Sequence, residues 1–229
     1  MKITKIECHV LLDPEYDPAA TSSAQDDLVV EVHTDEGIVG IGETDLNPWI
    51  ARECIEAPGT HTMDQGLGSM LIGENPLEIE KLWWKAYQAT AMTGRRGALI
   101  NALGAIDMAL WDIAGKAADK PVWQLLGEKS REHLGAYASL QPEVGSFDAY
   151  ITSMVKWAHS AKEMGFRAAK LETTFSGPYA NMGIREDDEK MTEVIRAVRN
   201  AVGPDFTLMV DVQYAFDSVD RAINTINTW

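Results

Sequence analysis

Between residues 166 and 216 the chain holds two short apolar segments that each end in polar side chains. Residues 167–172 and 207–213 have the length and apolar character of buried strands, and residues 186–202 between them have the spacing of an amphipathic helix. A crossover helix between two strands of one sheet makes those strands parallel, so their carboxyl ends lie at the same edge. The segment therefore predicts a βαβ unit.

The shared edge of that unit would gather a reactive set of side chains. Lys170 and Glu172 end the first strand, and Asp211 and Gln213 end the second. Ligands in parallel α/β folds bind at the carboxyl ends of the strands. An ammonium group beside two carboxylates can serve both proton transfer and metal binding, so these four side chains are the candidate site.

The first 130 residues show a different order of elements. Alternating apolar and polar residues predict strands over 4–12, 28–34 and 37–43, joined as an antiparallel meander in which glycines of the third strand permit close backbone approach. Helices are predicted over 76–90 and 96–118, the second with a buried apolar stripe. Strands followed by helices indicate an α+β unit, and acids on the second helix are expected to face solvent or a structural partner.

From residue 133 the pattern alternates strand and helix. A strand is predicted over 134–140, a helix over 147–164, then the βαβ unit, and a last helix from Ser218. Three βα units fit the start of a (β/α)8 barrel, and they fit a small open α/β sheet as well.

Composition limits the partners. A formal net charge of −15 argues against nucleic acid and anionic membranes, because both attract basic surfaces. Two cysteines give no disulfide framework, and we find no apolar signal segment or run near the ~20 residues of a membrane-spanning helix. We therefore expect a cytoplasmic protein.

Residues 102–116 read ALGAIDMALWDIAGK, followed by Pro121-Val122 and Leu125-Leu126-Gly127. This motif resembles the signature helix of the mandelate racemase and muconate lactonizing enzyme group of the enolase superfamily. The resemblance implies an α+β capping domain over residues 1–130, and the first three βα units of a modified (β/α)8 TIM barrel over 131–229. It also implies Mg²⁺ held by three acids at the ends of barrel strands three to five. The metal grips a substrate carboxylate while a base removes the α proton, and it stabilises the enediolate that forms.

Carried over by residue, Asp211 resembles the first metal ligand, and Gln213 stands where the family often has Asn and would contact substrate. Because side chains two apart on a strand share a face, both are expected to point into the barrel. Lys170 and Glu172 occupy the family's Lys-x-Lys pair. Glu172 replaces the lysine that is often the base, so contact with substrate, proton relay, an ion pair with Lys170 and a purely structural salt bridge all stay open for it. The main base is expected elsewhere, in the His–Asp dyad that many acid-sugar dehydratases of the family carry on later strands.

Two loops complete the expected site. Residues 13–25 resemble the family's mobile lid over the substrate, and Trp49 either joins that lid as a substrate contact or anchors a surface loop. The long loop 173–185, with Phe175, Tyr179 and Asn181, lines the pocket or packs on a neighbouring subunit.

The resemblance implies a Mg²⁺-dependent lyase that dehydrates a sugar acid to a 2-keto-3-deoxy acid, in an enzyme that forms symmetric homo-oligomers. A racemase, epimerase or cycloisomerase of the same superfamily is the alternative, and a non-catalytic scaffold that has lost its site is the third. About 100 residues follow the capping segment, whereas a whole barrel typically needs ~250. We therefore expect the remaining metal acids and the main base in further sequence, and no complete Mg²⁺ site in these residues alone.

Overall fold

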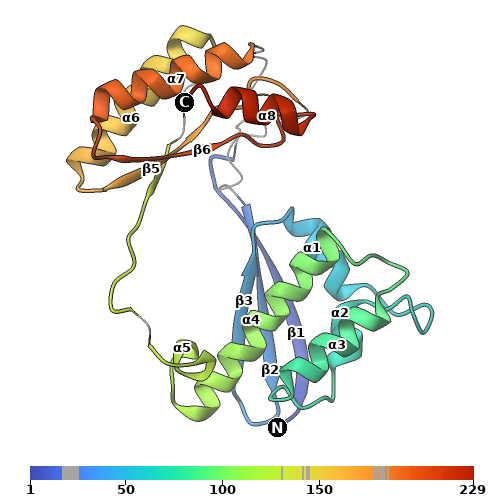
Figure 1. Cartoon of the computed structure of the whole chain (residues 1–229). Helices are drawn as coiled ribbons and strands as arrows, with labels where there is room; N and C mark the ends of the chain where they lie inside the picture. The colour runs from blue at the N-terminus through green and yellow to red at the C-terminus, as the bar shows by residue number, and fades with distance from the viewer. Residues whose placement is uncertain are drawn as a thin grey trace. The chain divides into compact units, whose positions relative to one another are not determined.

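The computed structural model describes residues 1–16, 26–129, 131–140, 142, 145–177, 180, 184 and 186–229. The chain divides into two units, Met1–Ser130 and Arg131–Trp229. Each unit has its own core of buried apolar side chains. Figure 1 traces the chain from the first unit, in blue to green, into the second, in yellow to red.

Unit 1 is built on a three-stranded antiparallel sheet in the order β1-β2-β3. The strands are β1 (Ile3–Leu12), β2 (Asp26–Thr34) and β3 (Val39–Thr44), which confirms the predicted meander. The third strand begins two residues later than predicted. Gly37 has a left-handed φ of +80° and closes the turn, so the sheet resumes only beyond it.

Five helices of unit 1 lie within the described residues: α1 (Pro48–Glu56), α2 (Leu67–Leu71), α3 (Ile79–Ala89), α4 (Ala98–Ala118) and α5 (Val122–Leu126). The long helices α3 and α4 confirm the two helical predictions. The short helices α1, α2 and α5 were not predicted, because five to nine residues carry too little apolar periodicity. A local signal for α1 was present: the side chain of Asn47 caps the helix by accepting from the backbone N–H of Ile50, and Pro48 occupies its first turn.

Helix α4 lies along one face of the sheet (Figure 1) and packs directly on β3. A Cβ atom built on Gly42 would lie 1.8 Å from the carbonyl oxygen of Ala105, and one on Gly40 would lie 2.1 Å from that of Ala109. The close backbone approach predicted for these glycines is therefore confirmed. On the same helix, Asp112 accepts from the backbone N–H of Ile41 at 2.8 Å, so this acid has a structural partner.

By length and apolar composition, α4 is the one helix among the described residues that could cross a membrane. Half of its most apolar window is buried within the chain. Leu99, Leu103, Ile106, Leu110 and Ile113, the predicted stripe, are all buried in the core of unit 1. The apolar character of α4 is explained by that core.

Unit 2 holds a parallel sheet in the order β4-β5-β6, as the βαβ prediction requires. Its strands are β4 (Ala138–Ser139), β5 (Ala168–Glu172) and β6 (Thr207–Asp211), and its helices are α6 (Phe147–Glu163), α7 (Asp188–Val202) and α8 (Val219–Ile226). Helices α6 and α7 lie side by side over the sheet (Figure 1).

The first strand of unit 2 is much shorter than the predicted 134–140. Ala138 pairs with Ala169, and β5 begins at Ala168, so residues before Tyr137 have no partner in this register. Leu134, counted in the predicted strand, is 83% exposed. The helices begin at side-chain caps: Ser146, Asp187 and Ser218 each accept a hydrogen bond from the backbone N–H three residues on.

Candidate active site

The carboxyl ends of β5 and β6 bring three of the predicted site residues together. The parallel register places Glu172 beside Asp211 and Lys170 beside Met209. The Nζ atom of Lys170 lies 3.1 Å from Oδ2 of Asp211, and both side chains are about one-third exposed (33% and 34%). The edge therefore carries a solvent-accessible ammonium–carboxylate pair, and the second carboxylate, that of Glu172, lies on β5 opposite Asp211.

The ion pair fixes the protonation of the lysine. Its hydrogen bond to Asp211 raises the pKa of Lys170 above the ordinary value, and the charges of Asp211 and Glu172 add to this against partial desolvation. Lys170 is therefore an ammonium group at neutral pH. In this state it can donate hydrogen bonds to an anionic substrate, and it is a poor base.

The partner of Lys170 in this ion pair is Asp211, whereas the sequence left a pairing with Glu172 open. Glu172 ends β5 and is half-buried, and its backbone carbonyl oxygen accepts a hydrogen bond from the hydroxyl of Tyr150. Tyr150 is fully buried on α6. The core of unit 2 thus fixes the position of the strand end that carries Glu172.

The strand predicted to run through Gln213 ends at Asp211, so that prediction is wrong. Gln213 and Tyr214 have left-handed φ angles of +33° and +62° and form a turn. The backbone N–H of Gln213 donates to Oδ1 of Asp211 at 3.2 Å. The two-residue alternation therefore does not apply to Gln213, although the residue stays adjacent to Asp211. Non-glycine residues in this conformation are uncommon and concentrate at functional sites.

A cationic side chain on α8 holds the two loops that follow β5 and β6. Arg221 donates to the carbonyl oxygen of Ala215 at 3.1 Å and to the hydroxyl of Ser176 at 2.8 Å. It also binds both carboxylate oxygens of Asp188, at 2.9 and 2.6 Å. Gly177 packs against the same turn, since a Cβ there would lie 2.7 Å from the carbonyl oxygen of Tyr214. Sequence reasoning missed this network, because no spacing rule links residues 188 and 221.

As a magnesium ligand, Asp211 has suitable chemistry. Mg²⁺ prefers carboxylate and water oxygens in octahedral geometry, and Asp211 offers a partly exposed carboxylate beside that of Glu172. Among the described residues, no third acid or histidine gathers with these two. The edge therefore fits one part of a magnesium site.

The structure corrects the local setting of two further predicted residues, Trp49 and Phe175. Trp49 is the second residue of helix α1 and 44% exposed, so it does not lie on a loop. Phe175 is 1% exposed and packs edge-to-face on Tyr150 with ring centroids 5.1 Å apart, which makes it a core residue of unit 2 rather than a pocket or subunit contact. Most of the expected lid (residues 17–25), together with Tyr179 and Asn181, lies outside the described residues.

The α+β unit and the parallel βα units are the two parts that the resemblance to the enolase superfamily implies. Residues 5–127, more than half of the chain, match the family described as "Mandelate racemase / muconate lactonizing enzyme, N-terminal domain". The chain belongs to the mandelate racemase and muconate lactonizing enzyme group of the enolase superfamily.

Similar proteins agree with this family. The chain is 34% identical to a D-galactarolactone cycloisomerase of Agrobacterium fabrum over 97% of its own length and 54% of the relative. It is 34% identical to an L-rhamnonate dehydratase of Saccharopolyspora erythraea over 83% of its length and 42% of the relative. The crystal structure of the 3,6-anhydro-D-galactonate cycloisomerase from Zobellia galactanivorans superposes with a TM-score of 0.77 at 27% identity, over 100% of this chain and 55% of that one. The chain thus spans about half the length of these enzymes.

Proposed function

We propose that the protein removes the proton α to the carboxylate of a sugar acid with Mg²⁺, and that the reaction is dehydration to a 2-keto-3-deoxy acid. The observation that carries the proposal is the pairing of Lys170 with Asp211 at the carboxyl ends of adjacent parallel strands, 3.1 Å apart and partly open to solvent. Ligands of parallel α/β folds bind at this edge.

Each group at the edge has a defined task in that reaction. Asp211 would hold Mg²⁺ through a carboxylate oxygen, as one of several ligands. The ion supplies positive charge that stabilises the anion left when the α proton is removed. Lys170, kept as an ammonium group, donates hydrogen bonds to the substrate carboxylate and adds to that positive charge. Glu172 stands where the family often has a lysine as the base. As a carboxylate, it accepts hydrogen bonds from sugar hydroxyls.

A cycloisomerase reaction is the second candidate. It is favoured by the D-galactarolactone cycloisomerase relative, which aligns with almost the whole of this chain. Racemisation or epimerisation would use the same α-proton abstraction, with a base on each face of the substrate. A scaffold that has lost catalysis would keep the fold without turnover.

We further propose a cytoplasmic homo-oligomer whose partner is a small carboxylate. The net charge of −15 supports the exclusion of nucleic acid and anionic membrane surfaces. Trp49 on α1 and Gln213 in the turn after β6 are the proposed substrate contacts outside the ion pair.

The test uses the complete protein, a panel of sugar acids and Mg²⁺, with the 2-oxo acid product detected as its semicarbazone. Lys170→Met and Asp211→Asn are each expected to lower kcat/KM at least about 100-fold, because both remove charge stabilisation of the transition state. Lys156→Met, an exposed lysine on α6, is the matched control and should leave turnover unchanged.

The outcomes separate the candidates. Formation of a 2-oxo acid supports dehydration. Consumption of substrate without a 2-oxo acid supports cycloisomerisation or racemisation. Normal turnover in Lys170→Met would contradict the task given to that lysine. No turnover with any acid sugar would favour a scaffold that has lost catalysis.

A further inference from the structure

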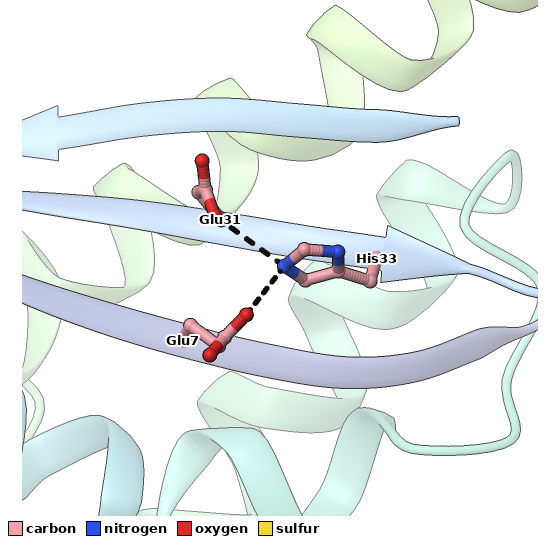
Figure 2. Close-up of side chains that lie close together, drawn as sticks. All are labelled: Glu7, Glu31 and His33. Atoms are coloured by element: carbon pink, nitrogen blue, oxygen red, sulfur yellow. Dashed lines mark ion pairs between the residues drawn. The ribbon is translucent and has the colours of Figure 1, made fainter. Parts of the chain in front are cut away.

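A second group of potential metal ligands lies on the sheet of unit 1. Glu7 is on β1, and Glu31 and His33 are on β2. Residues of β2 alternate between faces, and Leu28, Val30 and Val32 are buried in the core beneath α4. Glu31 and His33 therefore lie on the opposite face, as Figure 2 shows, with both carboxylates pointing to the same nitrogen of the ring.

The distances among these atoms are close to those of a metal site. Nε2 of His33 lies 2.9 Å from Oε2 of Glu7 and 3.4 Å from Oε2 of Glu31. Nε2 of His9, next along β1, lies 3.4 Å from that same Glu31 oxygen. In a tetrahedral site with bonds of ~2.0–2.2 Å, neighbouring ligand atoms lie about 3.3–3.6 Å apart. Small side-chain movements would therefore bring Glu7, Glu31 and His33 around one ion, and His9 lies next to this group through Glu31.

The opposed carboxylates of Glu7 and Glu31 favour a cation between them. Glu7 and Glu31 are directly opposite in the β1–β2 register, and like charges in that position destabilise a sheet. Both side chains are two-thirds buried, which weakens screening by solvent. Lys5 lies 2.5 Å from Oε1 of Glu7, and so leaves Oε2 turned towards His33.

The surroundings of the ring nitrogen of His33 point the same way. Within the described parts of the chain, Nε2 of His33 is sheltered from solvent and has no hydrogen-bond partner of normal geometry. A buried polar atom without such a partner requires an explanation, and an ion is one. Here the atom is directed at two carboxylate oxygens, which is where a shared ion would sit.

We propose that Glu7, Glu31 and His33, with His9 as a fourth ligand, bind one divalent transition-metal ion that joins β1 to β2. Zn²⁺ is the ion that the donors favour, because imidazole with carboxylate suits Zn²⁺, whereas Mg²⁺ prefers an all-oxygen set. The role is structural: the ion neutralises the opposed glutamates and, by binding only the folded sheet, stabilises unit 1.

The test is calorimetric titration of the protein with ZnCl₂ at pH 7.5 in excess Mg²⁺, which occupies all-oxygen sites. One Zn²⁺ per chain is expected. His33→Gln and Glu31→Gln should each weaken binding at least about 10-fold, as loss of a ligand does. His159→Gln, an exposed histidine on α6, is the matched control and should bind as the parent does.

A second measurement does not depend on the variants folding. In NMR spectra of the unaltered protein, one equivalent of Zn²⁺ should shift the imidazole resonances of His33 and His9 and leave those of His159 in place. Absence of Zn²⁺ binding by the parent protein, equal binding by His33→Gln, or a shift confined to other histidines would each overturn the proposal.

Discussion

Gly42 is where β3 comes closest to α4, and replacing it with alanine tests the packing of unit 1. The added Cβ would lie 1.8 Å from the carbonyl oxygen of Ala105 and 3.0 Å from the backbone nitrogen of Ala109. Close carbon–oxygen contacts in proteins are about 3.3–3.6 Å. Because the obstructing atoms belong to a helix backbone, no side-chain rotation can relieve the clash, and β3 must separate from α4 by about 1.5 Å.

The cost follows from the size of that separation. Overpacking a core typically costs about 1–3 kcal/mol, and the rigid backbone contact places Gly42→Ala at the upper end. The greater conformational entropy of glycine in the unfolded chain returns about 0.5–1 kcal/mol. The net loss of about 2–2.5 kcal/mol corresponds to a fall in Tm of roughly 4–10 °C for a chain of this size.

Thermal unfolding followed by circular dichroism at 222 nm measures this shift. Gly104→Ala is the matched control, because Gly104 lies inside α4 and a Cβ there would meet nothing within 4 Å. Alanine should stabilise the helix by about 0.5–1 kcal/mol and raise Tm slightly. A Tm for Gly42→Ala within about 2 °C of the parent, or an equal fall for Gly104→Ala, would refute the packing argument.

Three further predictions concern single side chains. The bidentate contact with Arg221 holds the pKa of Asp188 below its ordinary value. This carboxylate therefore stabilises the fold above the unfolded pKa of ~3.9, and the stabilisation is lost as the pH falls through the folded pKa. Asp188→Asn should lower the free energy of unfolding at pH 7 and reduce its loss in acid; equal changes between pH 7 and pH 3 in urea unfolding of the two proteins would contradict this. Ser146→Ala removes the cap of α6 and should cost about 0.5–2 kcal/mol in urea unfolding, whereas Ser146→Asp should retain most of the stability. Burial raises the pKa of Cys8 from 9.0 to about 12. At pH 8 its alkylation by iodoacetamide, followed by mass spectrometry, should therefore be roughly 1,000-fold slower in the native protein than in the unfolded chain. A native rate within about tenfold of the unfolded rate would contradict this.

The elements that the sequence predicted well are those whose pattern is local. The alternation of β1, β2 and β3 and the apolar stripe of α4 depend on neighbours a few residues away, and both are confirmed. The motif over residues 102–116 carried the family, which the comparisons show. The strand ends carrying Lys170 and Asp211 followed from one topological rule, that a crossover helix makes its strands parallel.

The features that escaped prediction depend on contacts far apart in sequence or on backbone conformation. The length of β4 was set by where its partner begins, and the end of β6 by the turn at Gln213. The hydrogen bonds of Arg221 to both loops arise only once α7 and α8 are packed. Glu7, Glu31 and His33 meet through the β1–β2 register, which alternation alone does not determine.

The left-handed backbone at Gln213 limits which residues can replace it. Glycine, asparagine and aspartate tolerate that conformation, while β-branched and bulky residues are strained in it by about 1–3 kcal/mol. In a randomised library at position 213, most substitutions would therefore lower the stability of the fold, whatever their effect on substrate binding. Besides the glutamine present, position 213 can therefore accept mainly glycine, asparagine and aspartate, and Tyr214, with a φ of +62°, is limited in the same way.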